Sequence, residues 1–156
     1  MDLLPFDEYV AALPRKRMAA GVLFRDDAGR VLLVEPSYQP YWDLPGGTVD
    51  AEESPWAAAT REVREELGIE RPRGDLLVID HRKSGDRLPE GLYFGFDGGL
   101  ITEAEVAALT LTPEILSARL FTRDELPAKT RPSLVARIDA AVEAQRGGRP
   151  VLLDTQ

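Results

Sequence analysis

The stretch "GGTVDAEESPWAAATREVREELGIE", residues 46–70, places a glycine pair ahead of a segment that is rich in glutamate. Ser54 is a favourable N-cap, Pro55 suits the first helical position, and Gly68 suits the position that ends a helix. These signals predict a helix over residues 55–67. The chain already carries a formal net charge of -8, so gathering more negative charge on one helix brings no obvious stability.

On a helical wheel, three glutamates of this segment gather on one arc. Glu62, Glu65 and Glu66 have i, i+3, i+4 spacing, so each neighbouring pair repels by about a few tenths of a kcal/mol. Either this arc is a hydrated surface or a cation lies among the carboxylates, and Mg²⁺ takes oxygen ligands of this kind. A neighbouring apolar arc is expected to face the core, and it carries Trp56, Ala59, Val63 and Leu67.

Length and composition limit the classes of protein that fit. The 156 residues suit a single domain, taken as 1–156. The net charge of -8 disfavours a surface for nucleic acid, because phosphate backbones are bound by clustered Lys and Arg. The absence of cysteine excludes disulfides, thiol nucleophiles and thiolate metal sites. No apolar run approaches the roughly 20 residues that span a membrane, and no signal-peptide pattern is present, so we expect a cytoplasmic protein.

The remaining patterns predict a mixture of strands and helices. The segment 101–113 is ambiguous between a short helix and a loop. The order of elements favours an α/β sandwich with a mixed sheet between helices over a doubly wound parallel sheet. The expected elements are a short amphipathic helix at about 2–13, strands at 17–25, 30–35, 75–83, 90–98 and 114–122, and a C-terminal helix at about 132–145.

The spacing of fixed residues in this stretch resembles the signature of the Nudix hydrolase family, the Nudix box, here residues 47–69. The segments "YWDLPGG" and "EILSARLFTRDELP" also resemble segments of many members. The resemblance implies a Nudix-type α/β/α sandwich with a mixed β-sheet between helices. The matching positions are Gly47, Glu53, Arg61, Glu62, Glu65, Glu66 and Gly68, with Val63 and Ile69 where an aliphatic residue is required.

The same resemblance implies an enzyme. Members cleave a diphosphate linkage by attack of water at phosphorus, with Mg²⁺ as the cofactor and Mn²⁺ as a substitute. Metal ions offset the charge of the diphosphate, orient it and lower the pKa of bound water. A Nudix-fold sensor that binds a nucleotide without cleaving it is the alternative, and the complete set of glutamates speaks against it.

The resemblance assigns metal-binding and catalytic roles to Glu62, Glu65 and Glu66, and it makes the backbone of Gly47 a further metal ligand. The water is deprotonated either by one of these glutamates or by a glutamate on a later loop. Glu114 is our candidate for that later catalytic carboxylate, because it opens the strand that resembles the corresponding segment. Glu103 and Glu105 are alternatives.

Other residues have a structural or a substrate-binding interpretation. Glu53 and Arg61 match positions that pair in the family and are expected to brace the loop against the helix. Three residues are candidates for binding the substrate: Arg17, in the basic run that starts at Arg15, and the aromatic residues Tyr41 and Trp42. A solvated cluster is the other interpretation of the basic run, and packing beneath the loop is the other interpretation of Trp42.

Residues outside the box narrow the substrate by elimination. ADP-ribose-type members often have a proline about fifteen residues after the box, where this chain has Ser84 and Gly85. The candidates left are nucleoside triphosphates and unassigned nucleoside diphosphate derivatives. The expected partner is therefore a small nucleotide or diphosphate molecule, without nucleic acid or membrane, and the chain is expected to be a monomer or a homodimer.

Overall fold

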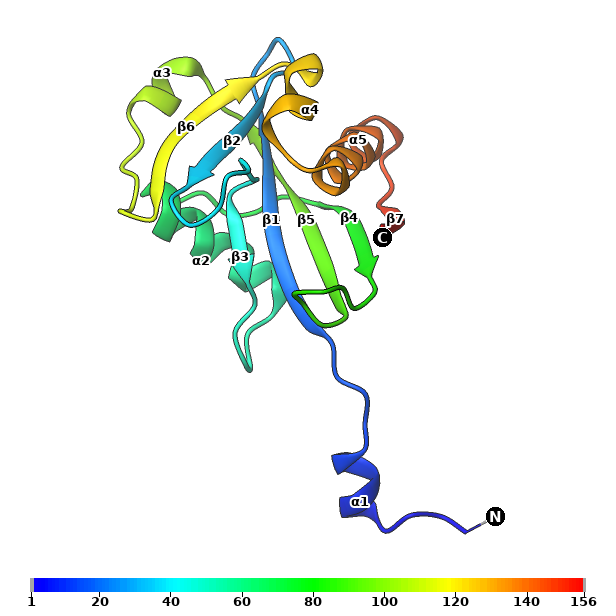
Figure 1. Cartoon of the computed structure of the whole chain (residues 1–156). Helices are drawn as coiled ribbons and strands as arrows, with labels where there is room; N and C mark the ends of the chain where they lie inside the picture. The colour runs from blue at the N-terminus through cyan, green and yellow to red at the C-terminus, as the bar shows by residue number, and fades with distance from the viewer. Residues whose placement is uncertain (1, 156) are drawn as a thin grey trace.

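The computed structural model describes residues 2–155 (Figure 1). The strands are β1 (Arg17–Arg25), β2 (Val31–Pro36), β3 (Gly46–Thr48), β4 (Leu76–Arg82), β5 (Gly91–Leu100), β6 (Ile115–Phe121) and β7 (Val151–Thr155). The helices are α1 (Phe6–Ala11), α2 (Pro55–Leu67), α3 (Glu103–Ala107), the short 3-10 helix η1 (Arg123–Glu125), α4 (Leu126–Lys129) and α5 (Pro132–Gly147). Within residues 2–155, no helix is long and apolar enough to cross a bilayer.

The strands form one mixed sheet in the order β6-β2-β1-β5-β4-β7, with β3 paired to β1. β1 is parallel to β5 and β4 is parallel to β7, whereas the other pairs are antiparallel. β3 pairs with residues 19–21 of β1, and β2 pairs with β1 at Arg25. β2 and β3 therefore share one edge of β1, and the loop between them leaves the sheet there.

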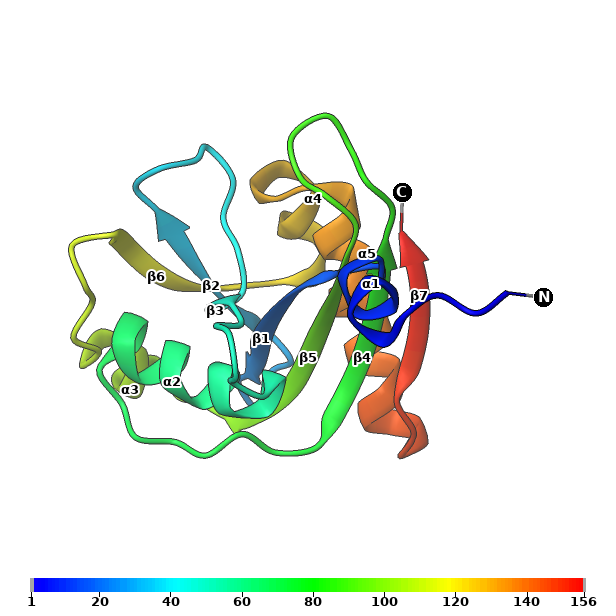
Figure 2. The same ribbon diagram turned by 90° about the horizontal axis from the view of Figure 1, so that it is seen from below.

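Helices cover both faces of the sheet (Figure 2). On one face, α5 packs Leu134 and Ile138 into a core that includes Leu23 of β1. On the other face, α2 packs Val63 into a core that includes Val22 of β1. Successive residues of a strand point to opposite faces, so one strand supplies both cores. The predicted α/β/α sandwich with a mixed sheet is confirmed.

The signals at the ends of α2 have the predicted effect. The Ser54 side chain accepts a hydrogen bond from the Ala57 N–H at 3.1 Å, and Pro55 occupies the first turn. Gly68 ends the helix with φ of 69°, a left-handed conformation that glycine adopts without strain. A side chain at Gly68 would also meet Thr110, because its Cβ would lie 2.9 Å from that Cβ. The helix therefore begins and ends where the sequence predicts.

The buried face of α2 is rotated slightly from the predicted arc: Ala59, Val63 and Leu67 are buried as predicted, but Trp56 is not. Trp56, which we expected in the core, is 53% exposed, whereas Ala58 and Ala59 are fully buried. The rotation brings the partly buried side chains of Glu62 and Glu66 toward the glycines of β3. Because these glycines have no side chains, the helix can turn its acidic arc toward the sheet, and Trp56 moves out to solvent.

The N-terminal helix is shorter than predicted and covers no core. It spans Phe6–Ala11 within the predicted range 2–13, and none of its residues is buried. Figure 1 shows α1 standing clear of the sheet, joined to β1 by an extended segment. The apolar spacing of this segment therefore predicts the helix correctly. In residues 2–155, however, the apolar side chains of this helix are not buried against the core.

Several elements beyond the predicted ones complete the fold. β3 is only three residues long and β7 follows the last predicted helix, which runs on to Gly147. The ambiguous segment 101–113 forms the short helix α3, whose N-terminus has a capping box between Thr102 and Glu105, followed by a loop. The predicted strands are present with ends that differ by one or two residues, apart from β1, which matches.

Candidate active site

Two glycines bring the backbone of β3 against the acidic arc of α2. The Gly46 N–H donates a hydrogen bond to Glu66 Oε1 at 2.7 Å. A Cβ on Gly46 would overlap the Ala20 carbonyl oxygen, and a Cβ on Gly47 would lie 2.5 Å from Glu62 Oε1. Only glycine allows this close approach, so the glycine pair places the two carboxylates beside the backbone of β3.

Arg61 holds the loop before α2 against the helix. Its Nε and Nη2 donate to the two carboxylate oxygens of Glu53 at 2.7 and 2.9 Å, and its Nη2 also donates to the Thr48 carbonyl at 3.2 Å. This contact with Arg61, together with the Asp50 N–H, lowers the pKa of Glu53 to about 2. The predicted bracing pair is present in the structure.

Arg61 also contacts two of the predicted metal-binding glutamates. Its Nη1 donates to Glu62 Oε1 at 3.1 Å and to Glu65 Oε2 at 3.0 Å. The side chain of Glu65 is 53% exposed, whereas that of Glu62 is only 17% exposed. The three predicted glutamates therefore lie in different surroundings, with Glu62 and Glu66 toward the sheet and Glu65 toward solvent.

The carboxylates near β3 lie in a strongly unfavourable electrostatic environment. Burial raises the pKa of Glu66 to about 8, and the charges of Glu62, Asp43 and Glu114 add to the increase, against a lowering by the Gly46 N–H. Burial also raises the pKa of Glu62, in spite of Arg61. A cation bound here would relieve both the desolvation and the repulsion.

The donor set fits a hard divalent cation such as Mg²⁺. The partly buried carboxylates of Glu62 and Glu66 can supply oxygen ligands, and the absence of a side chain on Gly47 lets the Glu62 carboxylate lie close to the backbone of β3. Within residues 2–155, no three acidic or histidine side chains already converge on one point. Arg61 and the Gly46 N–H hold Glu62, Glu65 and Glu66 instead, so these side chains would have to change partners to bind a metal.

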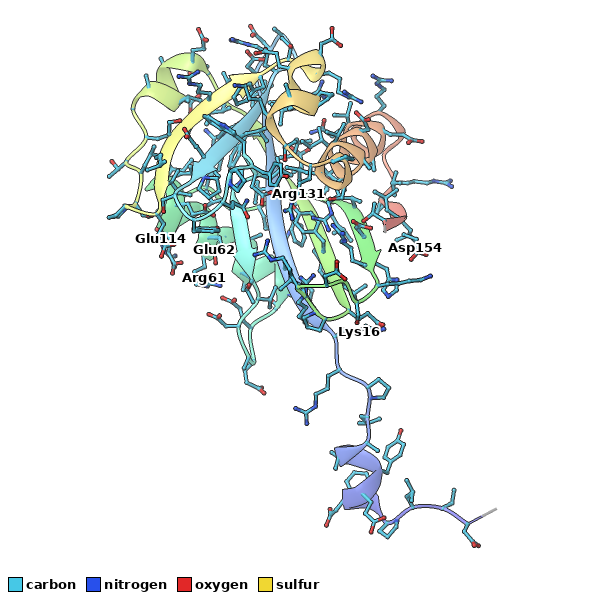
Figure 3. All side chains as sticks on the ribbon, in the orientation of Figure 1. Lys16, Arg61, Glu62, Glu114, Arg131 and Asp154 are labelled. Atoms are coloured by element: carbon cyan, nitrogen blue, oxygen red, sulfur yellow. The ribbon has the colours of Figure 1, made fainter. Side chains whose placement is uncertain are left out.

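The three candidates for the later catalytic glutamate lie in different surroundings. Glu114 lies in the exposed turn before β6, and its charge acts on Glu66. Figure 3 shows Glu114 and Glu62 on the same side of the molecule. Glu103 pairs with Arg30 at 3.0 Å, and Glu105 pairs with Arg71 at 2.7 Å, so both of these carboxylates are already engaged.

The residues predicted to bind substrate are dispersed. Trp42 packs edge-on against Phe121 with ring centroids 5.0 Å apart, and its carbonyl accepts a hydrogen bond from Thr130, so it packs beneath the loop. Tyr41 is 46% exposed. Arg17 lies at the start of β1, where its Nε donates to the Pro89 carbonyl at 2.9 Å. The substrate-binding roles of these three residues stay predictions.

Sequence reasoning missed two charged residues of this region, Asp43 and Arg131. Burial raises the pKa of Asp43, which is 3.8 Å from Arg131 and adds its negative charge to the surroundings of Glu66. Its position in "WDLPGG", three residues before the glycine pair, was the one available signal. Figure 3 shows Arg131 near the middle of the molecule. Nothing in the local sequence marks Arg131.

Known proteins share the motif and the fold. The family model described as the NUDIX domain matches residues 15–141. The chain is 47% identical over 66 residues to diphosphoinositol polyphosphate phosphohydrolase 2 from Rattus norvegicus. The aligned residues make up 41% of this chain and 37% of that protein. It is 34% identical over 76 residues to RNA pyrophosphohydrolase from Pseudomonas putida. This alignment makes up 49% of this chain and 48% of the relative.

A solved structure extends the likeness over most of the chain. The MutT protein from Methanosarcina mazei Go1 superimposes with a TM-score of 0.67 at 26% identity, over 88% of this chain and 99% of that one. The chain spans less than half the length of the two curated relatives. The family model, in contrast, covers well over half of the chain and includes the glycine pair, Arg61 and the glutamates of α2. The chain therefore belongs to the Nudix hydrolase family.

Proposed function

We propose that the chain is a Mg²⁺-dependent hydrolase that cleaves a diphosphate linkage by attack of water at phosphorus. The observation that carries the proposal is the pair of partly buried carboxylates, Glu62 and Glu66, held against the side-chain-free backbone of β3. Buried acidic groups that repel one another lower the stability of the fold, and such groups are typical of functional sites. Binding of a cation and a polyphosphate is the function that we assign to these two carboxylates.

The residues of the site divide by task in this proposal. Glu62, Glu65, Glu66 and the Gly47 backbone hold Mg²⁺, for which Mn²⁺ substitutes. The bound metal would offset the diphosphate charge and lower the pKa of the attacking water. Glu114 is exposed beside these groups and accepts the proton of that water.

The substrate class is inferred from what the curated relatives have in common. The two curated relatives are named for cleavage of a diphosphate in an inositol polyphosphate and in RNA, so the shared feature is the diphosphate itself. We propose a nucleoside diphosphate derivative or a nucleoside triphosphate, bound with the help of Arg17, Tyr41 and Trp42. A cytoplasmic location and a monomer or homodimer stay predictions from the sequence.

The test is hydrolysis of a panel of nucleoside triphosphates and diphosphate derivatives in Mg²⁺, in Mn²⁺ and in EDTA. Product analysis in ¹⁸O-labelled water should place the label in a phosphate product. We expect Glu66→Gln to lower kcat by about 100-fold or more and Glu65→Gln to lower it less, because Glu65 is exposed. Glu143→Gln, on the exposed face of α5, is the matched control and should be silent.

The outcomes separate the candidate functions. Turnover that survives both Glu65→Gln and Glu66→Gln would contradict the metal assignment. Binding of a nucleotide without any turnover in either metal would favour the sensor alternative. Loss of activity in Glu143→Gln would show that the assay reports general damage to the protein.

A further inference from the structure

Helix α1 has an apolar stripe that its own chain leaves exposed. Phe6, Tyr9 and Val10 have the i, i+3, i+4 spacing that places them on one side of a helix. All three side chains are exposed, and none of the six residues of α1 is buried. Isolated helices shorter than about 12 residues are only marginally stable in water. A helix of this length is therefore expected to pack its apolar stripe against another surface.

The segment that contains α1 is also acidic. Residues 2–14 include no lysine, arginine or histidine, and their carboxylates are those of Asp2, Asp7 and Glu8. On a helical wheel, Asp7 and Glu8 lie to either side of the apolar stripe. A surface that suits this helix thus combines an apolar centre with positive charge around it.

A cavity with an apolar lining lies between the β1–β2 turn, η1, α4 and α5. Its volume is about 250 Å³, and its apolar lining consists of Val31, Leu126, Ile138 and Val142. An apolar cavity of roughly 150 Å³ admits a benzene ring, so this one has room for a phenyl side chain such as that of Phe6. The cavity is lined by residues of neither β3 nor α2, so it is separate from the candidate active site.

The same cavity carries positive charge. Its charged lining residues are three arginines and two carboxylates: Arg25, Arg123, Arg146, Asp139 and Glu143. Arg123 is bound by Asp139 at 2.6 and 3.0 Å, whereas Arg25 donates to the uncharged side chain of Gln145 at 2.9 Å. Within residues 2–155, neither Arg25 nor Arg146 forms an ion pair. The cavity therefore complements an acidic helix in charge as well as in polarity.

The cavity and the helix lie at opposite ends of β1 in one chain. Figure 1 shows α1 beyond one end of β1 and the β1–β2 turn at the other end. β1 spans about 26 Å from Arg17 to Arg25, whereas the connection from Ala11 to Arg17 extends over about 20 Å at most. α5 also packs against the face of the sheet along which the helix would have to fold back. A second copy lying antiparallel to the first brings its α1 to the end where the cavity lies.

We propose that α1 docks in the cavity of a second copy of this chain. The apolar stripe lies on the apolar lining, and the carboxylates beside the stripe lie toward Arg25 and Arg146. Exchange in both directions gives a closed two-fold dimer, in which each copy supplies one helix and one cavity. This dimer is independent of the proposed hydrolase activity, because the cavity is separate from the candidate active site.

Sedimentation equilibrium of the full chain measures the dimer directly. We expect the wild type to dimerise with a micromolar Kd and Phe6→Ser to raise that Kd about tenfold or more, because aromatic side chains contribute strongly to interfaces. Phe6 is 75% exposed in its own chain, so its loss should not impair folding. Leu116→Ser is the matched control: it removes an apolar side chain that is 61% exposed, but on β6, and should leave the Kd unchanged.

Reversal of charge tests the cavity side of the contact. Arg146→Glu should raise the dimer Kd about tenfold, because it places a carboxylate where the acidic helix docks. Arg149→Glu makes the same change in charge at an exposed arginine outside the cavity lining, and it should change the Kd less than twofold. Melting curves of all variants check that each is folded.

The absence of cysteine from the chain allows the contact to be trapped chemically. A Val10→Cys chain is mixed with a Val142→Cys chain and treated with a short bismaleimide, so that a link between the two positions can form only between copies. We expect this link in high yield and little of it when Leu116→Cys replaces Val142→Cys. A chain that carries both Val10→Cys and Val142→Cys reports whether the link forms within one copy instead.

The inference is overturned if the wild type sediments as a monomer at about 100 µM, or if Phe6→Ser and Leu116→Ser change the Kd equally. It is also overturned if Arg146→Glu and Arg149→Glu have the same effect. A link that forms within the doubly substituted chain, while the mixed chains stay unlinked, would show that α1 docks on its own copy. A dimer without the link between Val10→Cys and Val142→Cys chains would use another surface and contradict the proposal. None of these measurements depends on hydrolysis, so the proposed function stands or fails separately.

Discussion

A single guanidinium, that of Arg61, contacts four carboxylates at once, those of Asp50, Glu53, Glu62 and Glu65. Its side chain and those of Glu53 and Glu62 are each about four-fifths buried, with exposed fractions of 21%, 17% and 17%. Water therefore screens these contacts only partly. At the scale of the residue, Arg61 both braces the loop before α2 and offsets part of the negative charge of Glu62 and Glu65.

Arg61→Ala should lower the free energy of unfolding by about 1–3 kcal/mol, because it leaves Glu53 and Glu62 without their partner. Arg64→Ala is the matched control on the same helix: its side chain is 51% exposed and lies 3.8 Å from Glu70. The control should change stability by less than about 0.5 kcal/mol. Urea unfolding of both variants measures the difference, and equal effects would show that Arg61 has no special role.

The contact between Glu53 and Arg61 should make stability depend on pH. The folded pKa of Glu53 is about 2, below the usual value of about 4.3 for an unfolded chain. The contact therefore stabilises the fold fully above about pH 4.3, and its contribution is lost as the pH falls toward 2. The difference in unfolding free energy between the wild type and Glu53→Gln should be constant from pH 7 to pH 5 and shrink below pH 4.3. A difference that grows on acidification would contradict this assignment.

Contacts between residues at fixed spacing within one segment were predictable from the sequence. Contacts between residues that only the tertiary structure brings together were not. The Glu53–Arg61 pair and the glutamates of α2 follow from positions within one short stretch. In contrast, Asp43 adding charge beside Glu66 and Arg82 lying across from Arg17 depend on how segments far apart in the sequence pair in the sheet. No local pattern records that pairing.

At the scale of the element, α2 was predicted to the residue because its caps are local signals. β3 was missed because three residues, two of them glycine, have no strand pattern, and it exists through its pairing with β1. β7 was missed because its five residues are recognisable as a strand only once β4 lies beside them. The face that α2 presents to the core was misjudged at Trp56, since the glycines that admit Glu62 and Glu66 belong to another element.

β4, β7 and α5 are joined by one buried carboxylate. Asp80 of β4 is fully buried and accepts hydrogen bonds from Arg137 of α5 at 2.7 Å and from the N–H and hydroxyl of Thr155 of β7 at 3.0 and 2.6 Å. Arg137 lies over the Tyr93 ring at 4.1 Å and is itself only 10% exposed. Removal of Asp80 would leave that guanidinium unpaired in the core.

Asp80→Ala should therefore cost about 3–5 kcal/mol of unfolding free energy. Asp139→Ala is the matched control, because Asp139 also pairs with an arginine, Arg123 at 2.6 Å, but both side chains are about half exposed. The control should cost about 0–1 kcal/mol. Chemical denaturation compares the two variants, and a loss below 1 kcal/mol for Asp80→Ala would mean that the buried pair does not hold these elements together.

At the scale of the whole molecule, the sheet places β2 and β3 on the same edge of β1 and thereby opens the sheet beside the acidic arc of α2. The glycine backbone and the carboxylates meet on that side. In the proposed function, this acidic side of the molecule is a metal site.

Titration with Mn²⁺, followed by the electron paramagnetic resonance signal of the free ion, tests that claim most directly. The wild type should bind Mn²⁺, and Mg²⁺ should displace it. Glu62→Gln combined with Glu66→Gln should weaken binding at least about tenfold, because it removes two of the oxygen ligands with their charges. Glu143→Gln should bind as the wild type does. Equal Mn²⁺ affinity in the double variant and the wild type would contradict the account.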